Sequence, residues 1–160
     1  MTWTASKVFR PFVADVLDNT TAVDLGTDVP KVAVFNNTPT PNQDVTSALS
    51  AFNAATSQWV TANEIIDTLN TNWVSGGRAL GSTSLNSSSA GIVFYDAADT
   101  TGAGNVTMTG FYGGLVYDDT LTTPVADQGM CYNYFGGTQT ITNGTVTIVW
   151  HANGIMRFTL

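Results

Sequence analysis

The stretch "GLVYDDTLTTPVADQGMCYNYFGG", from Gly114 to Gly137, decides the fold of this chain. Apolar and aromatic residues fill its two flanks, whereas its middle, "TLTTPVAD", is too long for a tight hairpin turn. The stretch therefore predicts two core strands joined by an acidic connection. Its aspartates, Asp118, Asp119 and Asp127, lie at the strand ends, where carboxylates are commonly solvated.

The chain beyond Trp73 has the same strand pattern. Short runs rich in β-branched and aromatic residues alternate with Gly, Asn, Asp and Ser clusters, which is typical of an antiparallel β protein. Upstream, "KVAVFNN" at 31–37 predicts one more strand, which ends at a Pro-rich turn. Asn143-Gly144 and Asn153-Gly154 each predict a type I′ hairpin turn, so we expect the last third to be an antiparallel meander.

One short amphipathic helix is predicted near the N-terminus. Pro11 is tolerated only in the first turn, so the helix begins near Arg10 or Pro11 and leaves an extended arm before it. We therefore expect an N-terminal arm and short helix over 1–20 and a single β domain over 21–160. The predicted fold class is mainly β, an antiparallel sandwich or a partly closed barrel. Residues 44–72 are compatible with either helix or strand.

Composition narrows the function. Charged residues make up only 11% of the 160 residues, the net charge is -7, and the five cations are scattered, which argues against nucleic-acid binding. No apolar run approaches the roughly 20 residues that span a bilayer, so we expect no membrane association. The N-terminus lacks the pattern of a secretion signal, and a lone cysteine excludes an internal disulfide. Synthesis and folding in a reducing host cytoplasm are expected.

A calcium site is the sharper alternative for the aspartate-rich loops. Loop carboxylates are suitable ligands for that ion, both in the connection after Asp118 and in the loop that carries Asp96 and Asp99. Neither loop has the D-x-[DN]-x-[DN]-G spacing with a distal glutamate. The favoured interpretation is therefore solvated loop edges without a metal.

No catalytic centre is expected. Cys131 lies within a predicted strand and is interpreted as a core residue, and a dyad with His151, the only histidine, would lack an orienting partner. Glu64 is the sole glutamate, which makes a glycosidase improbable, and the Gly-rich stretches lack the order of a P-loop. We expect a protein that is not an enzyme and needs no cofactor.

Several stretches together carry a resemblance: "YDDTLTTPVADQG", "CYNYFGG", "VWHANGI" and a terminal "RFTL", with "KVAVFNNTPTPN" and "GGRAL" upstream. Over most of its length the chain resembles small virion structural proteins of tailed bacteriophages, especially those that infect actinobacteria. Among these it most resembles a head decoration protein. The resemblance implies a location on the outer capsid surface, often as trimers that cement neighbouring capsomers.

The resemblance implies two partners, the major capsid protein and further copies of the chain in a homotrimer. On this hypothesis the segment 2–12 becomes ordered on a neighbour through the apolar anchors Trp3, Val8, Phe9 and Phe12, and its deletion leaves the β domain folded. Two other classes stay open. One is a tail-tube or tail-associated subunit, and the other is a glycan-binding virion module that uses exposed aromatic residues among Asn, Asp and Thr.

Overall fold

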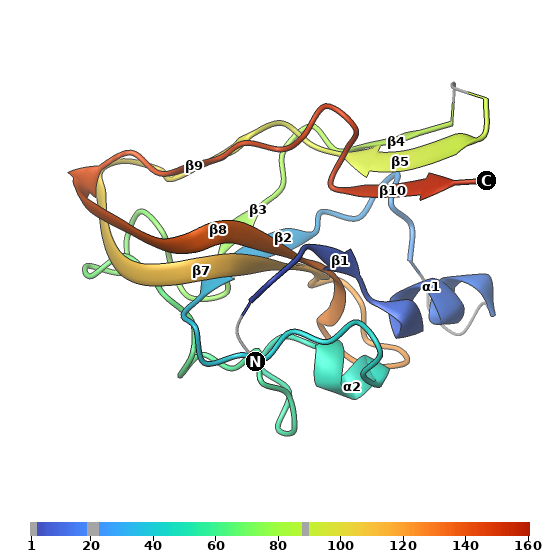
Figure 1. The fold of residues 1–160 in the computed structure, drawn as a ribbon, viewed down its shortest axis with the longest axis horizontal. Helices are drawn as coiled ribbons and strands as arrows, with labels where there is room; N and C mark the ends of the chain where they lie inside the picture. The colour runs from blue at the N-terminus through green and yellow to red at the C-terminus, as the bar shows by residue number, and fades with distance from the viewer. Residues whose placement is uncertain (1–2, 19–22, 88–89) are drawn as a thin grey trace.

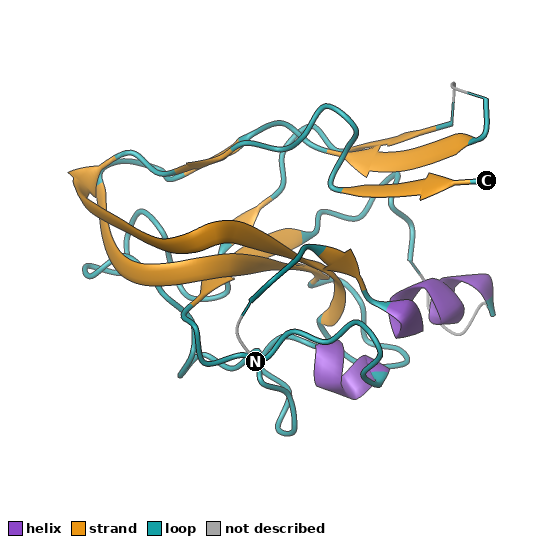
Figure 2. Ribbon diagram, viewed as in Figure 1, coloured by secondary structure: helices purple, strands orange, loops and turns teal. Residues whose placement is uncertain are grey.

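The computed structural model describes residues 3–18, 23–87 and 90–160, and within them the protein is mainly β (Figures 1 and 2). Residues 1, 2, 19 and 20 of the predicted arm and helix lie outside the described residues. Every described strand pair is antiparallel, as predicted. The elements are β1 (Lys7–Val8), α1 (Arg10–Leu17), β2 (Lys31–Phe35), α2 (Ser47–Ser50), β3 (Arg78–Ala79), β4 (Ser84–Asn86), β5 (Ile92–Asp96), β6 (Thr100–Thr101), β7 (Val106–Asp118), β8 (Gln128–Gly144), β9 (Thr147–Ile148) and β10 (Met156–Thr159).

The long hairpin of β7 and β8 is the centre of the molecule, which confirms the two core strands predicted from Gly114–Gly137. Leu115 pairs with Tyr132 and Val116 with Cys131. Residues 113–118 and 128–132 are continuously buried, so both faces of the hairpin are covered near its acidic connection. Register shifts along the pair accompany the curvature of the two strands in Figure 1.

The hairpin belongs to a five-stranded sheet with the order β1-β8-β7-β2-β3. Above it in Figure 1 lie two smaller sheets, β10-β5-β4 and β6-β9, which contribute Tyr95, Ile148 and Met156 to the common core. The opposite side is covered by the helices and by the irregular segment 51–77, which carries the fully buried Trp59 and Trp73. The sheets are open and do not close into a barrel.

Two local predictions from the sequence are confirmed. α1 begins at Arg10 with Pro11 in its first turn, where the missing N–H of proline leaves no helical bond unmade. The strand predicted over 31–37 is β2, and four of its residues, Val32 to Phe35, are buried in succession. A strand buried on both faces reads as a continuous apolar run, which explains why this one was recognisable.

The meander predicted for the last third is wrong. β8 continues through Asn143 and stays paired with β7 up to Gly144, which lacks the positive φ that a type I′ turn requires. At the second site only Gly154 has a positive φ, in a turn closed by its N–H to the carbonyl of His151 at 2.7 Å. β9 then pairs with β6, and β10 pairs with β5.

Two buried carboxylates organise the irregular segment, and one of them, Asp67, also joins it to the sheet. Glu64 accepts hydrogen bonds from the Ser75 hydroxyl at 2.8 Å and from the Gly76 N–H at 2.9 Å, and burial raises its pKa. Asp67 accepts the N–H of Thr107, at the start of β7, at 3.0 Å, and this bond lowers its pKa. Both acids therefore hold loops in place, a structural role.

Candidate functional site

The predicted partner-binding anchors lie within the fold of their own chain. Trp3, Phe9 and Phe12 are 2%, 0% and 3% exposed, and the half-buried Val8 packs against the same core. Phe9 lies edge-on to Trp59, with the ring centroids 6.2 Å apart. The structure thus places these side chains inside the domain, and removing residues 2–12 would open its core, contrary to the expectation that the remainder stays folded.

Backbone and side-chain bonds hold this N-terminal segment in the sheet. Lys7 and Val8 form β1, paired with Tyr132 and Cys131 of β8. The indole Nε1 of Trp3 donates to the carbonyl oxygen of Asn36 at 3.2 Å. The segment is therefore an edge strand and a core element of the main sheet.

The acidic connection between β7 and β8 differs from the predicted solvated loop, because Asp118 is completely buried. Its Oδ1 accepts bonds from the Thr120 N–H at 3.0 Å and from the Thr120 hydroxyl at 2.6 Å. Burial raises the pKa of Asp118, and the adjacent carboxyl group of Asp28 raises it further. The sequence could not show this, since Asp28 comes from the distant loop before β2.

The other two aspartates of the connection are half-buried. Asp119 forms an ion pair with Lys31 at the start of β2. Burial raises the pKa of Asp127, and the charge on Asp119 adds to that effect. The ion pair with Lys31 therefore joins the connection to β2.

Cys131 and His151 line a common hollow of about 230 Å³, but they do not form a catalytic pair. Burial raises the pKa of the Cys131 thiol to about 12, so it is protonated at neutral pH, whereas a nucleophilic cysteine needs a lowered pKa. Its Sγ is approached by the side-chain amide of Asn133 at 3.6 Å. The Nδ1 of His151 accepts the N–H of Asn153 at 3.0 Å, so in the neutral ring the proton is on Nε2.

A hollow of about 550 Å³ lies between the second half of β8 and the segment 145–155. We call it the β8 groove. Its lining includes the half-buried rings of Phe135 and Trp150, with Gln139 and His151 among the polar groups. It shares Ser6, Asn133, His151, Gly154 and Ile155 with the 230 Å³ hollow, so the two are continuous.

The β8 groove forms because β8 extends well beyond β1, the strand that pairs with its outer edge. β1 covers β8 only at Cys131 and Tyr132, and the hydroxyl of Ser6 accepts the N–H of Tyr134 at 3.0 Å just beyond it. From there to Gly144 no described strand pairs with the outer edge of β8. Since the sequence predicted a hairpin turn at Asn143-Gly144, the groove could not be anticipated from it.

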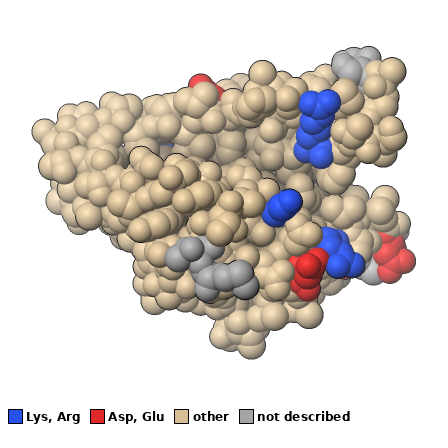
Figure 3. Space-filling view, viewed as in Figure 1, with Lys and Arg blue, Asp and Glu red and all other residues tan. Residues whose placement is uncertain are grey.

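A second surface feature lies at one end of the molecule. Five of the exposed large apolar residues come from α1, from the loop before β2, from β4 and from the C-terminus: Val16, Leu17, Val29, Leu85 and Leu160. α1, β4 and the C-terminus lie at the same end in Figure 1. We call the exposed apolar residues of these three elements, Val16, Leu17, Leu85 and Leu160, the apolar end. Figure 3 shows that most of the visible face carries neither acidic nor basic groups.

Searches of the described residues for a metal site and for a membrane-spanning helix, and of known proteins for a similar chain, found nothing. Among residues 3–18, 23–87 and 90–160, no group of three or more His, Cys, Asp or Glu side chains could hold a metal ion. No helix in the described structure is long and apolar enough to cross a membrane. The chain matches no protein-family model, no curated protein and no solved structure.

Proposed function

We propose that this chain is a non-enzymatic virion structural protein of a tailed phage, and that it decorates the outer surface of the capsid. The resemblance of its sequence to head decoration proteins motivates the proposal. We interpret the central sheet and the small sheets above it as an open sandwich whose surfaces, rather than a reactive centre, perform the function. The buried, protonated Cys131 thiol supports a role without nucleophilic chemistry.

The apolar end carries the proposal. Single exposed leucines are ordinary on protein surfaces, but exposed apolar side chains on three elements of the same end favour a binding surface there. Leu17 is 82% exposed, Leu85 55% and Leu160 88%. Only 11% of the residues of the chain are charged. The major capsid protein is the proposed partner, and the apolar end is the surface that docks on it.

Repetition on a lattice would compensate for a small interface. A capsid presents many equivalent sites, and linked copies, such as a homotrimer, raise the effective concentration at each neighbouring site. Contacts that are weak individually can then stabilise the shell. The proposed location is the outside of the head, after synthesis in the host cytoplasm.

Substitution at the apolar end tests the docking surface. Leu17→Ser removes an apolar side chain whose full burial is worth about 1.5–3 kcal/mol, so capsid affinity should fall about tenfold or more. The assay is co-sedimentation of the purified chain with capsids that lack it. Circular dichroism would verify that the variant is folded.

Leu69→Ser is the matched control. Leu69 is 76% exposed, and its neighbour Thr68 bonds to Thr107, at the far end of β7 from Asp118. This variant should bind capsids like the unmodified chain. Equal loss in both variants, or no loss at Leu17, would refute docking through the apolar end.

A further inference from the structure

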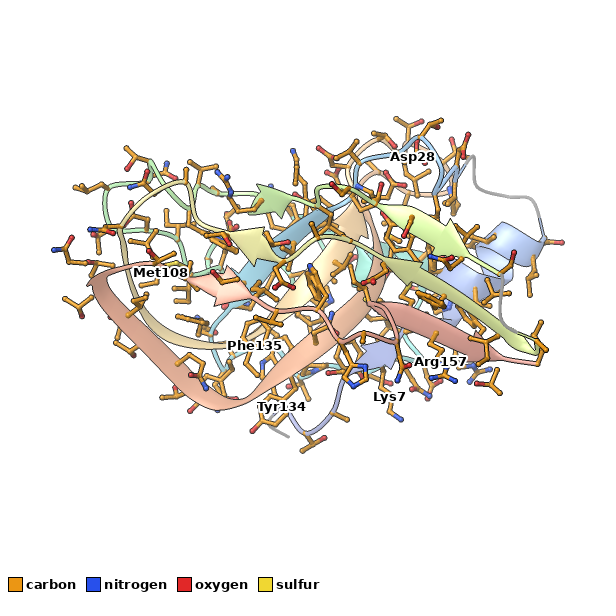
Figure 4. The ribbon with its side chains drawn as sticks, turned by 90° about the horizontal axis from the view of Figure 1, so that it is seen from above. Lys7, Asp28, Met108, Tyr134, Phe135 and Arg157 are labelled. Carbon is orange, nitrogen blue, oxygen red and sulfur yellow. The ribbon has the colours of Figure 1, made fainter. Side chains whose placement is uncertain are left out.

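The β8 groove and its continuation differ in charge from the rest of the molecule. The chain has twelve acidic residues and five basic ones. Yet none of the described residues that line the two hollows is acidic, whereas Lys7 and Arg157 both line the smaller one. Figure 4 shows these two cations near one another, with Tyr134 and Phe135 farther along the same side of the molecule.

Among the residues that the structure describes, these two cations also have no ion-pair partner. Arg10 and Lys31 form ion pairs with Asp44 and Asp119. Lys7 and Arg157 are exposed and form no ion pair with any described residue. Two unpaired cations on one hollow of an acidic protein favour binding of an anionic group.

The other end of the groove provides aromatic surface that is already fixed in place. Trp150 is held at two points, since its indole Nε1 donates to the Thr100 hydroxyl at 3.1 Å and its backbone N–H to Asp99 at 3.0 Å. Phe135 packs edge-on against Phe111, with the ring centroids 6.1 Å apart. Fixed rings lose little conformational entropy when a ligand packs on them.

Neutral hydrogen-bonding groups also line the groove, and one of them, His151, lines both hollows. The Nε2 of His151 carries the proton in the neutral ring, because Nδ1 accepts the Asn153 N–H. The side-chain amide nitrogen of Gln139 donates to the Phe135 carbonyl oxygen at 3.2 Å, which leaves the side-chain oxygen of Gln139 as an acceptor. Donors and acceptors beside aromatic rings match sugar rings, which have apolar C–H faces and hydroxyl edges.

We propose that the β8 groove binds an acidic saccharide, with sugar rings against Phe135 and Trp150 and a carboxylate or phosphate group near Lys7 and Arg157. A hollow of about 550 Å³ is within the range of about 300–1,000 Å³ usual for small-ligand sites, so it would hold a short saccharide segment. A nucleic acid fits less well, because two cations cannot neutralise a run of phosphates. This activity is additional to capsid decoration.

The test is isothermal titration of the purified chain with three probes at low salt. These are a short oligogalacturonate, a sugar-bearing glycerol-phosphate oligomer, and a neutral oligosaccharide of similar length. The acidic probes should bind more tightly than the neutral one, and their relative affinities distinguish a carboxylate from a phosphate ligand. Equal affinity for all three, or no binding, would overturn the proposal.

Paired substitutions test the two ends separately. Lys7→Gln with Arg157→Gln should weaken binding of the acidic probe roughly tenfold, as expected for two exposed charge contacts that act together, and leave the neutral probe unaffected. Phe135→Leu keeps an apolar side chain against Phe111 but removes the aromatic face, so it should weaken both kinds of probe. Amide spectra of each variant would establish that the fold is retained.

Arg10→Gln with Arg78→Gln is the matched control, because it removes two cations outside both hollows. If this control lost as much affinity as the Lys7 and Arg157 variant, net charge rather than the groove would explain binding. A short oligoglutamate that bound as tightly as the acidic saccharide would overturn the sugar assignment in favour of an acidic peptide. All these measurements use the isolated chain, so their failure would leave the proposed capsid role untouched.

Discussion

Truncation of Trp3 provides a direct test of whether the N-terminal segment belongs to the core. The indole is 2% exposed and lies edge-on to Trp59 and Tyr132, with ring centroids 5.5 and 6.2 Å away. Trp→Ala in a packed core costs about 3–5 kcal/mol. A domain of this size has a total stability of about 5–15 kcal/mol, so Trp3→Ala should remove a large part of it.

The assay is urea denaturation followed by far-UV circular dichroism, with the free energy of unfolding extrapolated to water. Lys7→Ala is the control on the same segment, since its side chain is exposed and unpaired and should change stability by less than about 0.5 kcal/mol. A loss below about 1 kcal/mol for Trp3→Ala would refute the reasoning. Trp3 would then lie on an arm outside the core, as the sequence alone had predicted.

Three further outcomes follow from the packing. Gly113→Ala should destabilise the fold by about 1–3 kcal/mol in the same assay, because a Cβ there would lie 2.3 Å from the Trp3 ring, whereas Gly81→Ala, in open space, should not. Asp118→Asn should raise the free energy of unfolding at pH 8 but not at pH 3. Because the pKa of Asp118 is raised in the folded state, its contribution to stability is present while the carboxyl group is protonated and is lost as pH rises through the folded-state pKa. An equal effect of the substitution at both pH values would contradict this. Iodoacetamide should label Cys131 slowly at pH 8 in the native protein and rapidly in urea, since burial raises the thiol pKa to about 12; equally rapid labelling in both states would contradict burial.

The parts of the fold that could be predicted are those fixed by local sequence. The start of α1 followed from the constraint that Pro11 imposes on a helix. β2 and the inner halves of β7 and β8 followed from β-branched and aromatic runs that can be buried on both faces. These signals need no knowledge of what the segment packs against.

The parts that could not be predicted depend on long-range partners. The Asn143-Gly144 turn signal was overridden because β7 is long enough to pair with β8 as far as Gly144. The sequence predicted that Asp118 is a solvated strand end, but in the structure it is buried next to Asp28, which comes from a distant loop. The N-terminal anchors looked available for a partner because nothing local indicates that Trp59, in an irregular segment, packs against them.

The candidate site was still harder to anticipate. Aromatic residues among Asn and Thr had suggested a glycan-binding alternative, but not where they would meet. The β8 groove joins the outer edge of β8 to the segment before β10, and its cationic end joins β1 to β10. Lys7 and Arg157 line the same hollow although they belong to different sheets, Lys7 to β1 beside β8 and Arg157 to β10 beside β5.

The proposed decoration role is tested most directly by looking for the chain in phage particles. On this proposal, virions of the encoding phage would be separated into heads and tails on a density gradient, and mass spectrometry would count the copies of the chain relative to the major capsid protein. The decoration proposal predicts abundant recovery with heads, in a fixed ratio to the capsid protein. Recovery only with tails would contradict it in favour of a tube or tail-tip subunit, and absence from both fractions would contradict any structural role in the virion.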